Sequence, residues 1–442
     1  MKFFKKTKSL KSACLLMLML LILPLQMLAA ELGEAGKRLA ALPGVSKVEP
    51  LQSTCFPEKY VFFIKQQLDA KNPQAGQFEQ RVVLCHRGFD RPTVLVTEGY
   101  DANYALHEGY IEELSKLFNT NIITVEYRYF DQSMPSPCNW DYLTVENSLY
   151  DLHHVNEALH ALYKGKWMAT GISKGGQTTM FYRSYFPNDV DISVPYVAPL
   201  NRSVEDGRHE KFLQYEVSTP ENRRKVLDFQ LLLFKRKAAL LPMLEKYCND
   251  KHYTFNAPLA EIYDFSVFEY AFAFWQWGSD IQKIPTREAD DLAVFKYWMS
   301  HCEPDYFSNQ NPYFSFDVQS AKELGYYGYY TKPFKRYLSI KTAKGYLHRL
   351  MLPKDAEEVK FSPVLYKHTV DFLSKNDPKM VYIYGSIDPW SASGIYGLPF
   401  TKNKQNLHVY MCPGGSHLTR ILSFPEPTRQ EIIDLIGRWL KE

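Results

Sequence analysis

Three residues of the types used in serine hydrolysis follow one another along the chain: Ser173, Asp388 and His417. Such chemistry needs a hydroxyl nucleophile, a base that takes its proton, and a carboxylate that holds the base in the right tautomer. Ser173 lies in a Gly-x-Ser-x-Gly turn between an apolar run and a helical pattern. This order of strand, turn and helix predicts a nucleophile elbow, in which a strained turn raises the hydroxyl above the sheet edge.

The other two residues each follow a predicted strand. The strand predicted at 379–384 leads into Asp388, and the strand predicted at 407–411 leads into His417. The order Ser, acid, His is that of α/β-hydrolases. An isolated Asp after a strand is usually a turn former, and an isolated His is usually structural. Three residues of the right types, in the right order and at three predicted strand ends, predict a catalytic triad.

An oxyanion hole requires two N–H donors. We expect one donor to be the backbone N–H of Lys174, the residue after the nucleophile. The second should come from the loop after an earlier strand, at Tyr100. The side chain of Lys174 is expected to be a surface or structural charge.

The surrounding elements alternate as a sheet with covering helices requires. A hairpin with a turn at 73–76 is predicted first, and strands alternate with helices as far as residue 198. The predicted strands span 60–64, 80–84, 92–97, 121–126, 166–172 and 192–198, and the helices 110–118 and 149–163. This rhythm predicts a parallel sheet with helices on both faces and a ligand site at the carboxyl ends of the strands.

The alternation of strands and helices stops after residue 198 and resumes with the strand that precedes Asp388. Residues 205–376 are mostly helical in pattern, with aromatic clusters at 268–277 and 325–330. The predicted architecture is therefore an α/β-hydrolase fold with a large, mostly helical cap. Residues 31–204 and 377–442 form the catalytic domain, and 205–376 form the cap.

Residues 1–30 have a basic head, an apolar core and small residues at the end, which predicts a signal peptide. The apolar core is short for a membrane span, so cleavage is favoured over anchoring. Loss of its five lysines turns the formal charge of +3 into −2. We therefore predict an exported protein, periplasmic or secreted, that binds neither nucleic acid nor, after cleavage, the membrane.

Six cysteines remain after cleavage, and an exported protein with an even number of cysteines can form disulfides. Six cysteines allow 15 pairings. Proximity along the chain suggests three, and free buried cysteines are the alternative: Cys55–Cys85, Cys248–Cys302 and Cys138–Cys412. Neither Cys-x-x-Cys nor His-Glu-x-x-His occurs, so no metal site and no cofactor are predicted.

Four blocks of sequence resemble the secreted prolyl tri- and tetrapeptidyl aminopeptidase family of serine peptidases. They are Thr97–Tyr100; Val125–Phe130 with 140–144; Gly171–Gln177 with 196–199; and Asp388–Trp390 with 413–417. Glu269 and 272–276 extend the match into the cap, and the resemblance covers nearly all of the chain after residue 30. Tyr127 replaces an expected His. The lysosomal dipeptidyl peptidase and prolyl carboxypeptidase family is a more distant likeness.

The resemblance implies release of short peptides from free N-termini, with Pro before the cut. Such an enzyme needs an anion that holds the substrate ammonium at a fixed distance from the nucleophile, and a flat apolar pocket for the residue before the cut. The candidate anions are Glu98, Glu126, Glu269 and Glu323, for each of which a structural ion pair or solvated position is the alternative. The candidate pocket walls are Trp390, Phe274, Trp275 and Tyr326, for each of which cap core is the alternative.

Three functions remain open at this level. The leading hypothesis is an exported serine exopeptidase acting on peptides with free N-termini through an acyl-enzyme. A secreted esterase or lipase would carry the same triad on the same fold. A binding protein on a hydrolase scaffold is the non-enzymatic alternative, against which the presence of all three triad residue types argues.

Overall fold

The computed structural model describes residues 31–442, so the predicted signal peptide lies outside the described residues. Within that range the chain forms a mixed sheet of nine strands in the order β1-β2-β3-β5-β4-β6-β7-β8-β9. The first three strands and β5 pair antiparallel, and β5, β4, β6, β7, β8 and β9 pair parallel. The strands are β1 Val45–Pro50, β2 Glu58–Gln67, β3 Gln77–His86, β4 Thr93–Val96, β5 Asn121–Val125, β6 Trp167–Ile172, β7 Ile192–Tyr196, β8 Met380–Gly385 and β9 Leu407–Cys412.

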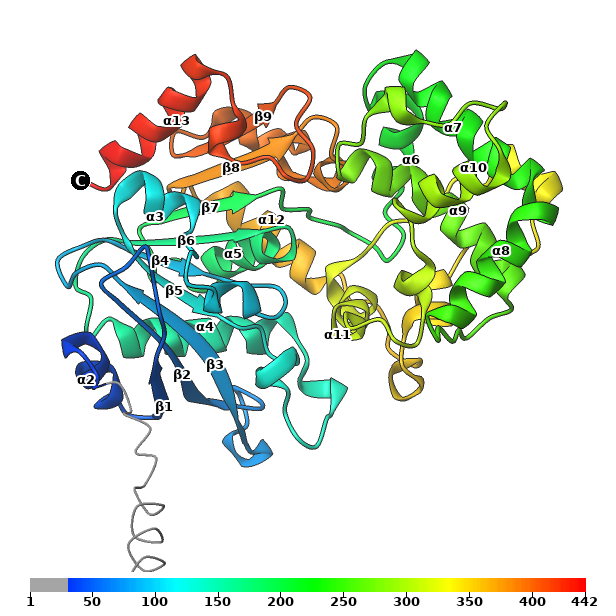
Figure 1. Ribbon diagram of the computed structural model, residues 1–442. Coiled ribbons are helices and arrows are strands. Elements are labelled where there is room, and N and C mark those ends of the chain that lie inside the picture. Colours follow the sequence, from blue (N-terminus) through cyan, green and yellow to red (C-terminus); the bar gives the residue numbers. More distant parts are fainter. Residues whose placement is uncertain (1–30) are drawn as a thin grey trace, which may run out of the picture.

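Helices cover both faces of this sheet (Figure 1). One face packs against α2, α4, α5 and α12 through a continuous apolar cluster, and the other packs against α3 and α13. These helices are α2 Glu34–Ala40, α3 Glu113–Phe118, α4 Val145–Leu159, α5 Lys174–Tyr185, α12 Val364–Lys375 and α13 Glu426–Trp439. The layered α/β-hydrolase fold predicted from the strand and helix rhythm is thus confirmed, and the predicted hairpin forms β2 and β3 of its antiparallel part.

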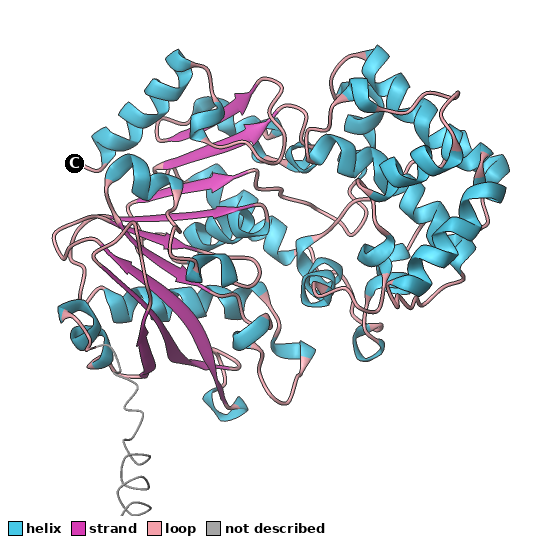
Figure 2. Ribbon diagram, in the orientation of Figure 1, coloured by secondary structure: helices cyan, strands magenta, loops and turns pink. Residues whose placement is uncertain are grey.

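The segment between β7 and β8 contains helices joined by loops, has no strand, and lies beside the sheet (Figure 2). Its own aromatic cluster extends to Tyr127, Phe130 and Trp390 of the sheet domain. Its helices are α6 Gly207–Lys211, α7 Pro220–Lys235, α8 Lys237–Asp250, α9 Leu259–Gln276, α10 Asp291–Met299 and α11 Phe314–Gln319. The predicted cap segment ends with α12, which packs on the sheet layer, where His368 Nε2 lies 3.2 Å from the Ser184 carbonyl of α5.

Within residues 31–442, no helix combines the length and apolarity that a membrane span needs. The predicted disulfides are absent, since all six cysteines of this range are free. Cys85, Cys248, Cys302 and Cys412 are instead buried as small apolar side chains, and Cys138 is exposed.

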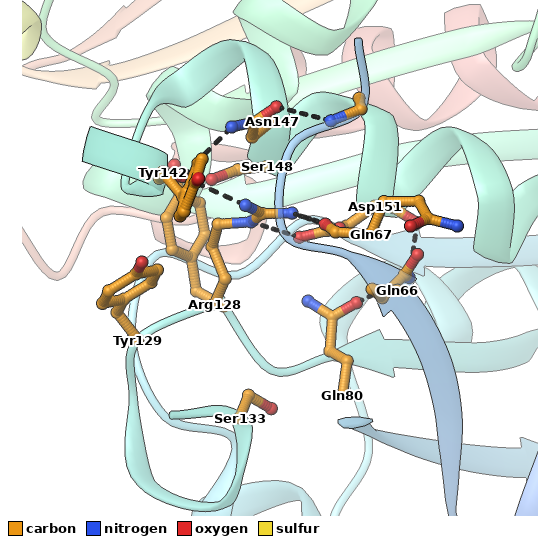
Figure 3. Close-up of polar contacts among 12 residues, drawn as sticks. Gln66, Gln67, Gln80, Arg128, Tyr129, Ser133, Tyr142, Asn147, Ser148 and Asp151 are labelled. Carbon is orange, nitrogen blue, oxygen red and sulfur yellow. Dashed lines mark hydrogen bonds and ion pairs between the residues drawn. The ribbon is translucent and has the colours of Figure 1, made fainter. Parts of the chain in front are cut away.

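A buried ion pair ties the chain after β5 to helix α4 (Figure 3). The Arg128 guanidinium donates from Nε and Nη2 to the two carboxylate oxygens of Asp151, at 2.7 Å each. Its remaining N–H groups donate to the carbonyls of Gln67, Leu68 and Tyr142. Both side chains are at most 3 % exposed. This ion pair therefore fixes the position of residues 126–130, which follow the carboxyl end of β5.

We expect Arg128→Met to destabilise the fold by about 3–5 kcal/mol, because the Asp151 carboxylate would stay buried without a partner. The measurement is urea unfolding at neutral pH. Arg38→Met is the matched control: Arg38 pairs with Glu34 on α2, where both side chains are more than half exposed, and the expected loss is about 0–1 kcal/mol. Equal losses in the two variants would contradict the structural role of the buried pair.

Candidate active site

The turn after β6 has the strained geometry expected of a nucleophile elbow. Ser173 has φ 58° and ψ −118°, a conformation that L-residues rarely adopt. Its N–H donates to the Tyr196 carbonyl at the end of β7, at 2.9 Å. The side chain is only half-buried, and α5 begins at the next residue. The elbow thus presents the Ser173 hydroxyl at the carboxyl edge of the sheet, beside a helix N-terminus.

Two glycines make the elbow sterically possible. A Cβ on Gly171 would lie 2.3 Å from the Gly175 carbonyl oxygen, and one on Gly176 would lie 2.6 Å from the Tyr196 carbonyl oxygen. A Cβ on Gly175 would meet nothing closer than 3.5 Å. The close approach that the motif requires is therefore made at Gly171 and Gly176, whereas Gly175 accommodates ordinary packing.

Asp388 and His417 meet beyond the ends of the adjacent strands β8 and β9. His417 Nδ1 lies 2.9 Å from Asp388 Oδ2. Asp388 is fully buried, and it also accepts the Ser391 hydroxyl at 3.0 Å and the Trp390 N–H at 3.1 Å. This arrangement can hold the imidazole with Nε2 free to act as a base. No hydrogen bond joins Ser173 to His417 among residues 31–442.

The cap contacts the histidine directly. The backbone N–H of His417 donates to the Gln276 carbonyl at the end of α9, at 2.9 Å. The Trp277 ring stands edge-on to the His417 imidazole, with the ring centroids 6.2 Å apart. Helix α9 therefore runs from His417 into the cap. Sequence reasoning missed this contact, because a backbone carbonyl carries no residue-type signal.

The four candidate anions lie in different environments. Glu126 is fully buried, forms an ion pair with Arg81 and accepts the Ser133 hydroxyl, so its charge is already neutralised. Glu323 accepts the N–H of Val145 at 2.6 Å and so caps α4; burial raises its pKa to about 7. Glu98 accepts the Gly99 N–H at 3.0 Å and the Tyr104 hydroxyl, and burial raises its pKa.

Glu269 on α9 forms no ion pair among residues 31–442, and the same holds for Glu98 and Glu323. Its carboxylate accepts hydrogen bonds from the Tyr327 hydroxyl, 3.0 Å from each oxygen, and from the Tyr329 hydroxyl at 2.6 Å. Burial raises its pKa to about 7, and the two tyrosine hydroxyls oppose that rise. The run of tyrosines at 326–330 was the sequence signal for this site, although the pattern alone does not show that two of them share one carboxylate.

The candidate pocket walls divide into two groups. Trp390 packs edge-on against Phe272 at 5.1 Å and Tyr327 at 5.3 Å, and Tyr326 stands 5.5 Å from the same indole. This cluster connects the Asp388 loop to the tyrosines that hold Glu269. Phe274 is fully buried against Tyr270 and His301, so it is part of the cap core.

A cavity of about 450 Å³ lies in the cap next to this cluster. Its wall includes Phe272, Trp275 and Tyr329, together with residues of α7. None of the three predicted triad residues contributes to it. Tyr329 lines the cavity and also donates to Glu269, whereas Glu269 itself does not line it.

The structure decides between the two alternatives expected for the Lys174 side chain, a surface or a structural charge. This side chain is 2 % exposed and lies beneath the loop after β4, so it is not a surface charge. Burial lowers its pKa well below the usual value.

Together these features define an α/β-hydrolase with a serine elbow and an Asp–His pair at its carboxyl edge. Residues 31–429 match the model of the family described as PS-10 peptidase S37, and the chain belongs to that family. The protein is therefore a serine peptidase. The match confirms the resemblance drawn from the sequence.

Two relatives with known names are also described as peptidases. The chain is 28% identical over 421 residues to the prolyl tri/tetrapeptidyl aminopeptidase of Streptomyces mobaraensis, covering 91% of this chain and 84% of that protein. A probable serine protease EDA2 of Arabidopsis thaliana is 27% identical over 145 residues, 28% of this chain and 30% of that one. Among solved structures, the proline iminopeptidase of Mycobacterium smegmatis has 13% identity and a TM-score of 0.41, covering 89% of this chain and 99% of that one.

Proposed function

We propose that this protein is an exported serine aminopeptidase that releases tri- or tetrapeptides from free N-termini, with a preference for proline before the cut. Ser173 attacks the carbonyl carbon, His417 takes the hydroxyl proton and gives it to the leaving amine, and Asp388 orients His417. Water then hydrolyses the acyl-enzyme. The backbone N–H groups of Lys174 and Tyr100 donate to the oxyanion. The hydrogen bond from Ser173 to His417 forms when substrate excludes water from the site.

The observation that carries this proposal is the placement of Glu269. Its carboxylate has only tyrosine hydroxyls as partners, which leaves its charge available to a substrate ammonium. Glu269 precedes Gln276, the residue that holds His417, by seven positions of one helix. Seven helical residues rise about 10 Å. An extended peptide spans about 3.3–3.6 Å per residue, so a rise of this size along α9 corresponds to about three residues.

The remaining contacts supply the specificity. Trp390 and Tyr326 stand beside the Asp388 loop and offer flat apolar surfaces on which a proline ring packs. The cap cavity next to Tyr329 receives the side chain at the N-terminal end of the substrate. Of the other candidate anions, Glu98 lies in the loop after β4 that carries Gly99 and Tyr100 (the oxyanion loop), while Glu126 and Glu323 have structural partners.

The function is tested with three substrate sets: peptides with a free N-terminus and Pro at the second, third or fourth position, the same peptides N-acetylated, and short-chain esters. We expect cleavage of the free peptides after the third or fourth residue and little cleavage of the acetylated ones. Equal cleavage of free and acetylated peptides would remove the ammonium anchor, and turnover of esters alone would make the protein an esterase.

We expect Glu269→Gln to lower kcat/KM for free peptides by about 30-fold to 1000-fold, since a buried charge partner of the ammonium is lost. The effect should depend on pH. The carboxyl has a pKa of about 7, so Glu269 is ionised and binds the ammonium only as the pH rises through that value. The ratio of wild-type to variant kcat/KM should therefore rise between pH 6 and about 8, where the α-amino group itself begins to lose its proton.

The matched control for this variant is Glu261→Gln, on the first turn of the same helix, where Glu261 pairs with Arg349. It should leave kcat/KM within about 2-fold of wild type, as expected for a partly exposed ion pair. A ratio for Glu269→Gln that stays constant with pH would contradict the assignment of Glu269 as the anchor.

A further inference from the structure

The side chain of Lys174 occupies an unusual position for a lysine next to a nucleophile. It forms no ion pair with a carboxylate among residues 31–442. Instead its Nζ donates to the Gly99 carbonyl oxygen. The amine lies 3.6 Å from the ring centroid of Tyr127 and 4.7 Å from that of Phe130. Burying a lysine amine in this apolar and aromatic surrounding costs free energy, so we asked what its hydrogen bond contributes.

The amine is hydrogen-bonded to the peptide group that joins Gly99 and Tyr100. The Gly99 carbonyl and the Tyr100 N–H belong to one planar unit, in which they point in opposite directions. A hydrogen bond that holds the oxygen therefore restrains the direction of the N–H, which the Glu98 carboxylate also faces. Bonding at the carbonyl also polarises the amide and strengthens its N–H as a donor.

The loop also rests directly on the lysine stem. A Cβ on Gly99 would lie 2.7 Å from Lys174 Cβ and 2.8 Å from its Cγ, so only glycine allows this approach. The Tyr127 side chain beneath the amine accepts a hydrogen bond at its hydroxyl from the Gln319 amide at 3.1 Å, and its backbone N–H donates to the Tyr100 carbonyl at 3.0 Å. Elbow, oxyanion loop and the segment after β5 thus meet at one buried amine.

We propose that Lys174 is a positioning residue that builds the oxyanion hole from both sides: its backbone N–H is one donor, and its side chain, through the Gly99 carbonyl, sets the direction of the Tyr100 N–H. The inference rests on the proposed function in so far as Tyr100 is taken as the second donor. It assigns to the lysine side chain a role in the transition state rather than in substrate binding.

The charges that face the amine are those of Glu98 and Glu323, both of which favour its protonated form against the effect of burial. Either protonation state of the amine carries an N–H that can donate to the Gly99 oxygen. The positioning role therefore does not depend on a change of charge in the working pH range.

The test is Lys174→Met, which keeps the length of the stem and removes the donor. We expect kcat to fall about 100-fold, as for the loss of one oxyanion donor, while KM changes less than about 3-fold. A second measurement is the rate at which a diphenyl phosphonate labels Ser173, since the phosphonyl oxygen occupies the same hole; it should fall in the same proportion. Unchanged kcat and labelling in a folded variant would overturn the inference, as would a rise of KM alone.

Lys59→Met is the matched control. Lys59 is also buried, donates to a single backbone carbonyl, that of His107, at 2.6 Å, and faces the ring of Tyr110 at 5.7 Å. It lies on β2, away from the elbow. Its variant should lose thermal stability and keep the kcat and labelling rate of wild type.

If Lys174→Met does not fold, Tyr127→Leu keeps the amine and removes the ring beneath it. We expect a fall in kcat of about 3-fold to 10-fold, in line with the usual strength of a cation–π contact, and an unchanged value would overturn the inference. The labelling rate also separates this inference from the proposed function. Wild type that is labelled rapidly but cleaves no peptide would contradict the aminopeptidase, and the comparison of labelling rates would still decide the role of Lys174.

Discussion

Replacing Ser173 by Ala is expected to lower kcat for unblocked peptides by about 10⁶-fold, which leaves no measurable turnover. The reason is that the hydroxyl is the nucleophile and no other group at the elbow can form the acyl-enzyme. Folding should be preserved, because Ser173 Oγ has no hydrogen-bond partner within residues 31–442. Steady-state kinetics, thermal unfolding and intact-mass detection of phosphonate labelling together measure this outcome.

Ser184→Ala is the control for the nucleophile. Ser184 lies at the other end of α5, is buried and donates to the Phe181 carbonyl at 2.8 Å. Its variant should keep wild-type turnover and still accept the phosphonate label. Hydrolysis that persists in Ser173→Ala at more than a trace would place the nucleophile elsewhere and end the triad assignment.

The second large effect is expected from Asp388→Asn, with a fall in kcat of about 10⁴-fold. The Asp388 carboxylate is fully buried and fixes the proton of His417 on Nδ1 through the 2.9 Å contact. An amide NH₂ facing that nitrogen would stabilise the opposite tautomer, whose Nε2 carries the proton and cannot accept one from Ser173. The kcat at neutral pH and the thermal midpoint are the quantities to measure.

Ser391→Ala is the matched comparison, because the Ser391 hydroxyl donates to the same carboxylate oxygen as His417 does. Its loss removes one neutral hydrogen bond and should cost about 10-fold or less. If Asp388→Asn and Ser391→Ala had effects of the same size, the tautomer of His417 would have to be set by another group.

Much of the fold follows from local pattern. The runs at 121–126 and 192–198 became β5 and β7, and the amphipathic stretch at 149–163 became most of α4. Burial on both faces makes such strands continuous apolar runs, which chain sequence alone reveals. Helix α2 and strand β1 at the start of the described range were not predicted. Strand β1 lies at the sheet edge and has no buried residue, so it lacks an apolar run.

The environments of the candidate glutamates could not be predicted from local sequence pattern. Glu126 and Glu269 both stand in plausible motifs, yet Glu126 meets Arg81 from β3, and Glu269 meets only the hydroxyls of Tyr327 and Tyr329. These partners are 45 and about 60 positions away in the chain. These distant neighbours therefore determine which carboxylate can still bind a substrate ammonium. The free energy of pairing a buried charge is large enough to produce this difference between the two glutamates.

By itself the sequence determined the Gly-x-Ser-x-Gly turn at Ser173, the chain order Ser173, Asp388, His417 that predicts a triad, and the family, because these depend on residue type and short-range spacing. Only the tertiary structure decided that Asp388 touches His417, that α9 joins His417 to Glu269, and that the amine of Lys174 is buried beneath Gly99. The physical reason is that burial and hydrogen-bond partners are properties of packing between distant segments. Composition and periodicity describe each segment separately and do not contain them.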